Sequence, residues 1–144
     1  MADFKKALSK VLKWEAGYVN DPDDAGGETF AGVSRKNNKN WKGWPIIDKH
    51  KVGIMLPQGL SRLNERLFAD DKLMALVDEL YKSNYWDPIQ LDIITSQRIA
   101  EEIFDTAVNM GVGTAVKFAY EACGLEPSTK VTTELINTLV KIKS

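Results

Sequence analysis

The sequence predicts a mainly α fold, of the α+β class, with one small β-hairpin element near the N-terminus. Two observations lead to this prediction. Apolar residues recur at helical spacing through most of the chain, and the segment Tyr18–Ser34 interrupts them with turn residues and with aromatic or β-branched residues. With 144 residues and 44% hydrophobic content, the chain has the size of one domain that buries a core without disulfides.

The first predicted helix begins after Asp3, a typical N-cap residue, and ends before Gly17, a typical terminator. Its apolar residues are Phe4, Ala7, Leu8, Val11 and Leu12. At 3.6 residues per turn, Glu15 falls on the same face as Leu8 and Val11. We therefore expect a carboxyl group on the buried side of the last turn.

The rest of the chain alternates between irregular and helical segments. Arg35–Leu60 is polar and contains several glycines and prolines, so it is expected to form a loop with short helical pieces. Helical spacing returns at Asp70 or Asp71. Further helices are predicted from there to about Pro88, from about Ser96 to Gly111, from about Thr114 to Cys123 and from about Thr132 to Lys143.

The composition argues against several classes of function. The net charge of −1 argues against nucleic-acid binding, although Arg35–Lys51 holds six Lys/Arg against one acid and could be either a solvated loop or a contact for an anionic polymer. The chain has a single cysteine, Cys123, which excludes an internal disulfide. It also has a single histidine, His50, which argues against a metal site with several histidine ligands. We expect no metal and no cofactor.

The sequence shows no feature of a membrane or exported protein. No apolar run approaches the roughly 20 residues of a membrane span, so stable membrane insertion is not expected. The opening residues, MADFKKALSKVLKWE, contain neither the apolar stretch nor the cleavage pattern of a signal peptide. We therefore expect synthesis in the cytoplasm without a visible signal peptide.

Three side chains near the N-terminus are those that a glycosidase needs: Glu15, Asp24 nine residues later, and Thr29 five further on. Glycoside hydrolysis requires an acid that protonates the leaving oxygen and a carboxylate that activates water or attacks the sugar. Burial and the negative end of the helix dipole are expected to raise the pKa of Glu15 above that of a free glutamate. Asp24 in a polar loop would stay ionised and orient water, and Thr29 could share that water.

Other interpretations of the acidic turn remain open. Asp21 and Asp23 are rivals of Asp24 for the second carboxylate, and Glu28 is a weaker one. Asp residues beside a proline often make local turn hydrogen bonds instead. A calcium loop is a further alternative because oxygen ligands are dense here, but the ligand order does not fit an EF-hand.

Candidate substrate-binding residues lie in the hairpin and the polar loop. Gly27 would let the backbone approach a ligand, and Tyr18 could line a sugar cleft or act as a structural staple. Trp41 and Trp44 could stack on sugar faces or anchor the loop.

A second set of candidates lies on the predicted helix that ends at Gly111. Asp105 and Asn109 are four residues apart on one helical face, and they predict either a buried hydrogen-bonded pair or part of a cleft floor. Asp105 is also a reserve candidate for the second carboxylate.

Three ordered motifs resemble those of the glycoside hydrolase family 108 lysozymes, which are bacterial and prophage N-acetylmuramidases. A Glu-Gly-Gly-Tyr-like element followed by an Asp-x-Gly-Gly-x-Thr element corresponds to Glu15–Tyr18 and Asp24–Ser34. The Tyr-Trp-x-Pro element corresponds to Tyr85–Pro88, and the Phe-Asp-x-Ala-Val-Asn-x-Gly element to Phe104–Gly111. Together the motifs extend over most of the chain.

This resemblance implies a single lysozyme-like domain over residues 1–144, with a catalytic region in 1–90 and a C-terminal helical, peptidoglycan-binding-like region in 91–144. It implies cleavage of the β-1,4 bond between N-acetylmuramic acid and N-acetylglucosamine in peptidoglycan glycan strands, with Glu15 in the place of the essential glutamate. The spacing of Glu15, Asp24 and Thr29 is also similar to that of phage-type lysozymes, which implies an inverting reaction.

The resemblance further implies action in the periplasm or cell wall, reached through a holin-like export partner or by lysis. One alternative is a non-catalytic peptidoglycan-binding or secretion-associated module of the same fold. Ala16, which replaces a glycine of the family pattern, and a C-terminal part that departs from that pattern would mark such a module.

Overall fold

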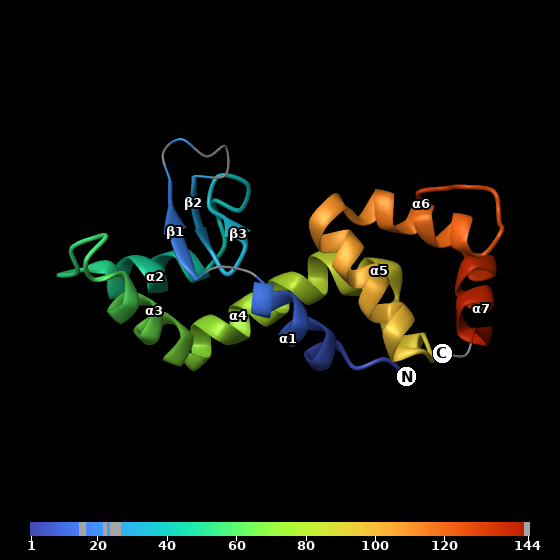
Figure 1. The fold of residues 1–144 in the computed structure, drawn as a ribbon, viewed down its shortest axis with the longest axis horizontal. Coiled ribbons are helices and arrows are strands. Elements are labelled where there is room, and N and C mark those ends of the chain that lie inside the picture. Colours follow the sequence, from blue (N-terminus) through green and yellow to red (C-terminus); the bar gives the residue numbers. More distant parts are fainter. Residues whose placement is uncertain (15–16, 22, 24–26, 143–144) are drawn as a thin grey trace. The chain divides into compact units, whose positions relative to one another are not determined.

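The fold is described from a computed structural model, which covers residues 1–14, 17–21, 23 and 27–142. The chain divides into two compact units. We call Leu12–Glu79 the sheet unit, and Met1–Val11 together with Leu80–Ser144 the helical unit. Figure 1 shows the order of the elements, which are mainly helices with one small antiparallel sheet. The predicted fold class is confirmed.

The first helix, α1, spans Phe4–Trp14 and matches the predicted one. The Lys6 N–H donates to the Asp3 carboxylate at 3.2 Å, so Asp3 caps the helix as expected. The side chains that α1 buries include Phe4, Leu8 and Val11.

The sheet consists of three antiparallel strands in the order β1 (Tyr18–Asn20), β2 (Glu28–Phe30) and β3 (Val33–Ser34). Between β2 and β3, both residues of the two-residue turn have positive φ: Ala31 at 49° and Gly32 at 81°. This is the turn geometry that suits tight hairpins. The unusual conformation of Ala31 coincides with a bond from its N–H to the Gly17 carbonyl at 3.2 Å.

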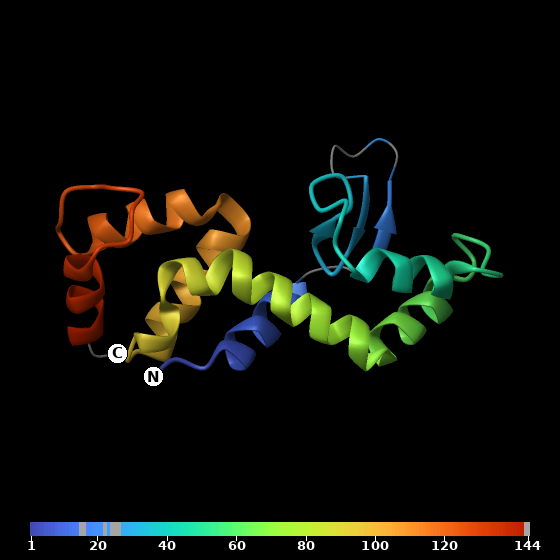
Figure 2. The same ribbon diagram turned by 180° about the vertical axis from the view of Figure 1, so that it is seen from behind.

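Two helices, α2 (Gly43–Lys51) and α3 (Leu60–Ala69), pack on one another in the sheet unit (Figure 2). Pro45 does not break α2, because it lies in the first turn, where no intrahelical N–H donor is needed. The helix α3 is an addition to the predicted elements. It buries Leu63 and Leu67, one turn apart.

The next helix, α4 (Asp71–Tyr81), begins where the sequence predicts it, with the Asp70 carboxylate accepting from the Leu73 N–H at 3.0 Å. A π-helical turn η1 (Lys82–Trp86) and two 3₁₀ turns, η2 (Asp87–Ile89) and η3 (Leu91–Ile93), follow it.

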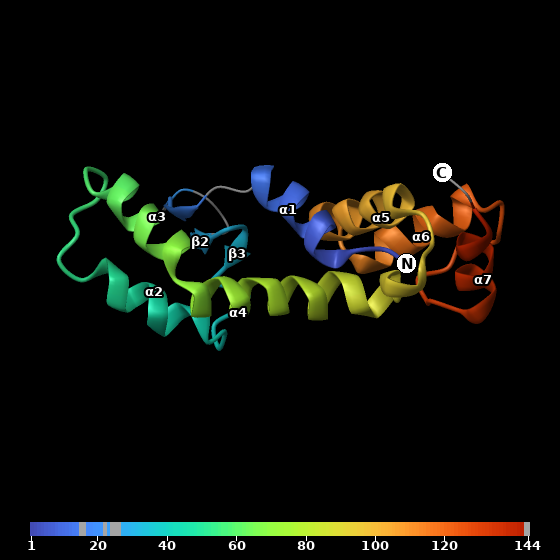
Figure 3. The ribbon, with the colours of Figure 1, turned by 90° about the horizontal axis from the view of Figure 1, so that it is seen from below.

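In the helical unit, α5 (Gln97–Met110) and α6 (Val112–Ala122) pack side by side, and α7 (Thr133–Lys141) completes the chain's helices (Figure 3). Ser96 and Thr132 cap α5 and α7 through their hydroxyls, as their positions in the sequence predict. None of the helices in the described part of the chain has the length and apolar character needed to cross a bilayer.

An aromatic cluster forms the core of the helical unit. Phe4, Trp86 and Phe104 meet edge to face with ring centroids 5.3–5.7 Å apart, and Tyr81 packs on Phe104 at 6.5 Å. Trp86 and Phe104 are fully buried. The expected division into a catalytic region (1–90) and a C-terminal region (91–144) concerns function, and it stays a prediction.

Candidate active site

The predicted catalytic residues lie at the start of the sheet unit. Glu15 and Asp24 fall outside the described residues. Thr29 lies on β2, half-buried, where it pairs with Val19 of β1 and Ser34 of β3. Asp21 accepts a bond from the Asp23 N–H at 2.9 Å, which is the local turn interaction that was the alternative to a catalytic role.

Tyr18 and Gly27 lie at opposite ends of the hairpin strands. Tyr18 is 2% exposed, so in this structure it packs in the interior. Its backbone N–H donates to Asn64 Oδ1 of α3 at 2.8 Å, which ties β1 to that helix. Gly27 has a φ of 61° and open space where a Cβ would stand, so glycine is needed here for its conformation.

Glu28 is the centre of a hydrogen-bonded network that joins the sheet to α2. Its carboxylate accepts from the Tyr18 hydroxyl at 2.5 Å, from Lys51 at 2.7 Å and from Arg35 at 2.9 Å. Arg35 also donates two bonds to Asp48, both at 2.8 Å. We call these five side chains the Glu28 network.

The network fixes the ionisation of its members. Burial raises the pKa of Glu28, but the hydrogen bonds from Lys51, Tyr18 and Arg35 outweigh it, so the pKa lies below its ordinary value. The Arg35 hydrogen bonds likewise lower the pKa of Asp48. Glu28 is therefore a carboxylate with three donors, which is unsuited to donate a proton as a general acid.

The two loop tryptophans pack on one another, with ring centroids 5.4 Å apart and nearly perpendicular planes. Trp44 is 1% exposed, donates its indole N–H to the Asn38 carbonyl and lies under the Arg35 guanidinium, an arrangement typical of a loop anchor. The half-buried Trp41 lies over Gly43, where a Cβ would meet its ring at 2.5 Å. The Trp41 indole N–H is buried and has no acceptor among the described residues.

Asp105 and Asn109 lie on α5 in the helical unit. The Asn109 amide donates to the Asp105 carbonyl at 2.9 Å and to its carboxylate at 3.1 Å. The predicted hydrogen-bonded pair is therefore present, but both residues are exposed, in contrast to the expected burial. The pair occupies the solvent-facing side of a helix whose opposite side carries the aromatic core.

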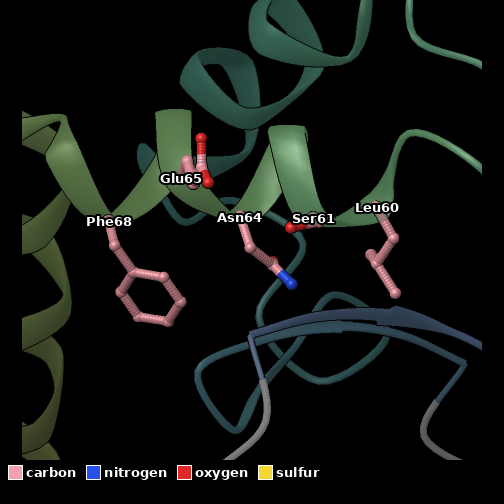
Figure 4. A pocket seen from close by; sticks show the side chains of 5 residues that line it. All are labelled: Leu60, Ser61, Asn64, Glu65 and Phe68. Carbon is pink, nitrogen blue, oxygen red and sulfur yellow. The ribbon is translucent and has the colours of Figure 1, made fainter.

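A groove of about 570 Å³ runs along α3, and sequence reasoning does not predict it. It is lined by Leu60, Ser61, Asn64, Glu65 and Phe68. Figure 4 shows Leu60, Asn64 and Phe68 projecting from one side of the helix, as expected for residues four apart. The signal that could have revealed it is the Leu-x₃-Asn-x₃-Phe stripe of half-buried Leu60, half-buried Asn64 and exposed Phe68, which lies apart from the buried Leu63 and Leu67.

The groove adjoins the hairpin through Asn64. A Cβ at Gly17 would meet Asn64 Oδ1 at 2.5 Å, so the backbone at Gly17 lies directly against this amide. Gly17 follows Glu15 by two residues in the chain. The groove is thus connected to the segment that holds the candidate acid.

Comparison with known proteins identifies the family. Residues 8–111 match the family model described as glycosyl hydrolase 108, which covers more than half of the chain. The chain belongs to the glycosyl hydrolase 108 family. No curated protein matches the chain.

Among solved structures, the fold is similar to that of SagA from Brucella abortus, with a TM-score of 0.63 and 23% sequence identity over 97% of this chain and 70% of that one. At this identity the similarity concerns the fold. The predicted resemblance to family 108 and the predicted lysozyme-like α+β fold are both confirmed. Membership in this family indicates a glycoside hydrolase that acts on peptidoglycan.

Proposed function

We propose that this protein is an N-acetylmuramidase that cleaves the β-1,4 bond between N-acetylmuramic acid and N-acetylglucosamine, with Glu15 as the general acid. The observation that carries the proposal is the family match over residues 8–111, which includes Glu15 and the hairpin that follows it. The donors of Glu28 support the choice of Asp24 over Glu28 as the carboxylate that orients water, since Tyr18, Lys51 and Arg35 already occupy the Glu28 oxygens.

In this mechanism Glu15 protonates the leaving oxygen while Asp24 orients a water molecule with help from the Thr29 hydroxyl. Water attacks the sugar from the opposite face, so the configuration at the anomeric carbon inverts. The Glu28 network supports the hairpin on which Thr29 lies, because it joins β2 to α2 through Lys51. No cofactor takes part.

The remaining assignments follow from the same proposal. Residues 1–90 carry catalysis and residues 91–144 form a helical region that supports substrate binding. Gly27 and Trp41 are the hairpin and loop candidates for contact with the glycan, whereas Tyr18 and Trp44 act through packing. The exposed Asp105–Asn109 pair remains a candidate contact for the strand, and the protein reaches the cell wall through a holin-like pore or on lysis.

The test is release of muropeptides from purified sacculi. General acids contribute about 10²–10⁴-fold to such rates, so Glu15→Gln should lower the rate by at least about 100-fold. Glu79→Gln is the matched control, because Glu79 is an exposed glutamate on α4 without an ion-pair partner in the described part of the chain. New reducing ends at muramic acid from the wild type, in the α configuration initially, complete the expected result.

Two outcomes contradict the proposal. If Glu15→Gln and the wild type cleave equally well, another residue is the acid. If the wild type binds sacculi and releases nothing, the protein is a non-catalytic module of the family fold.

A further inference from the structure

We propose that the α3 groove binds one N-acetylglucosamine unit of the glycan strand. The proposal rests on the proposed function for the identity of the polymer, but the chemistry of the groove selects the sugar. Its lining combines two apolar side chains, a hydroxyl, an amide and a carboxylate. Such a mixture of apolar surface and a few polar groups is typical of small-molecule sites.

The apolar part of the groove is suited to the face of a pyranose ring. Phe68 is 44% exposed although it packs on Phe30, with ring centroids 5.2 Å apart. This contact with Phe30 on one side steadies the ring. Leu60, two turns earlier on the same side of α3, provides a second apolar contact at the other end (Figure 4).

The polar side chains of the groove have donors and acceptors that a ligand could use. Asn64 Oδ1 accepts from the Tyr18 N–H, so the oxygen is fixed, and the Nδ2 group, for which the described residues provide no acceptor, is the donor that a ligand could use. Within the described residues, the side chains of Ser61 and Glu65 have no hydrogen-bond or ion-pair partner. A hydroxyl, an amide donor and a carboxylate complement the hydroxyl and acetamido groups of a neutral sugar.

The charge of Glu65 separates N-acetylglucosamine from free N-acetylmuramic acid. Free N-acetylmuramic acid carries a lactyl carboxylate, which a groove with an unpaired carboxylate repels, whereas in the glycan strand the lactyl group carries the stem peptide and adds bulk beside the ring. N-acetylglucosamine carries no charge, and Glu65 can accept hydrogen bonds from its hydroxyls. The groove is therefore a site for the uncharged sugar, next to the backbone that leads to Glu15.

The test is titration of the ¹⁵N-labelled full-length protein with chitotriose, a probe made only of N-acetylglucosamine. Amide shifts should concentrate in residues 60–68. Phe68→Ala and Phe68→Leu should each weaken binding about tenfold, because both remove the aromatic face. Phe68→Leu retains apolar volume against Phe30, so it stays informative if Phe68→Ala unfolds.

Phe118→Ala is the matched control, because Phe118 is also 44% exposed but lies on α6 in the helical unit. It should leave chitotriose binding unchanged. Glu65→Gln should leave chitotriose binding within about twofold. Free N-acetylmuramic acid should shift the groove amides of this variant and should leave those of the wild type unchanged.

Shifts outside α3, or equal effects of the Phe68 and Phe118 variants, would overturn the groove proposal. Its failure can be told apart from failure of the proposed function. If sacculi are cleaved but chitotriose does not bind the groove, only the groove proposal fails. If chitotriose binds the groove but sacculi are not cleaved, the groove proposal stands and the muramidase proposal fails.

Discussion

In the sheet unit a carboxylate with three donors holds the strands against α2, whereas in the helical unit four aromatic rings hold α1, α5 and the π-helical turn together. Glu28 receives bonds from Tyr18, Arg35 and Lys51, and each bond depends on charge and direction. Trp86 and Phe104 are fully buried, and their contacts depend on close packing of apolar surfaces.

The Glu28 network therefore supports the candidate site, whereas the aromatic cluster supports the fold of the helical unit. A directional network fixes the register of a short sheet that has little apolar area of its own, and it does so beside Thr29, one of the residues proposed for catalysis. An aromatic core, by contrast, depends on apolar burial and on the volume of its side chains. Stability of the sheet unit should therefore depend on pH and on single charges, and stability of the helical unit on volume.

The largest expected effect is loss of the Trp86 ring. Trp86→Ala removes a fully buried indole that contacts Phe4 and Phe104, and it should lower the free energy of unfolding by about 3–5 kcal/mol. Urea unfolding followed by far-UV circular dichroism measures this loss. Trp86→Phe is the control, since it keeps one aromatic ring while it removes the indole bond to Asp92 and part of the buried volume. A loss under about 1 kcal/mol in Trp86→Ala would show that the cluster is not the main support of the helical unit.

Next is neutralisation of the Glu28 carboxylate. Glu28→Gln keeps the shape but removes one of the two carboxylates that Lys51 and Arg35 share, the other being Asp48, so we expect a loss of about 1–3 kcal/mol at pH 7. Hydrogen exchange of the β1 and β2 amides localises the loss to the sheet. Equal protection in the variant and the wild type would contradict the role given to the network.

The same network predicts a pH dependence. The folded pKa values of Glu28 and Asp48 lie below their unfolded values, so their contribution is full above the unfolded pKa and is lost as pH falls through the folded pKa. The wild type should lose stability between about pH 5 and pH 3, and Glu28→Gln should lose less over that range. Urea unfolding at both pH values measures the difference. Equal losses in the two proteins would remove Glu28 as a source of the dependence.

The sequence predicts the helical unit better than the sheet unit, for a physical reason. Helices such as α5 carry a local signal, the spacing of Ile103, Phe104 and Ala107 after the cap Ser96, and the structure confirms it. The sequence pattern does not predict the helix α3, because a loop rich in glycine and proline precedes it and contains no clear N-cap signal. Pro45 is tolerated in α2 because it lies in the first turn of the helix. The presence of a proline in the sequence does not by itself show whether it will lie in a first turn or break a helix.

Side-chain partnerships are harder to predict than elements. Glu28, Arg35 and Asp48 lie up to 20 residues apart in the chain, and nothing in their spacing indicates that they meet. The sequence allows Tyr18 to be either a cleft residue or a structural staple, and its burial and its bond to Glu28 favour the staple. The three motifs resemble those of the family over most of the chain, and the match over residues 8–111 confirms that family.

The smallest expected effect tests whether burial, rather than charge itself, gives Glu28 its importance. Glu102 pairs with Arg98 on α5 at 3.5 Å, but the two side chains are 67% and 77% exposed. Exposed pairs four apart on a helix contribute about 0.3–0.5 kcal/mol, so Glu102→Gln should shift the free energy of unfolding by no more than this. Parallel urea titrations of Glu102→Gln and Glu28→Gln make the comparison direct, since both variants replace the same carboxylate by the same amide. Similar losses would mean that solvent screens the Glu28 network as fully as a surface pair, and the sheet would then need another source of support.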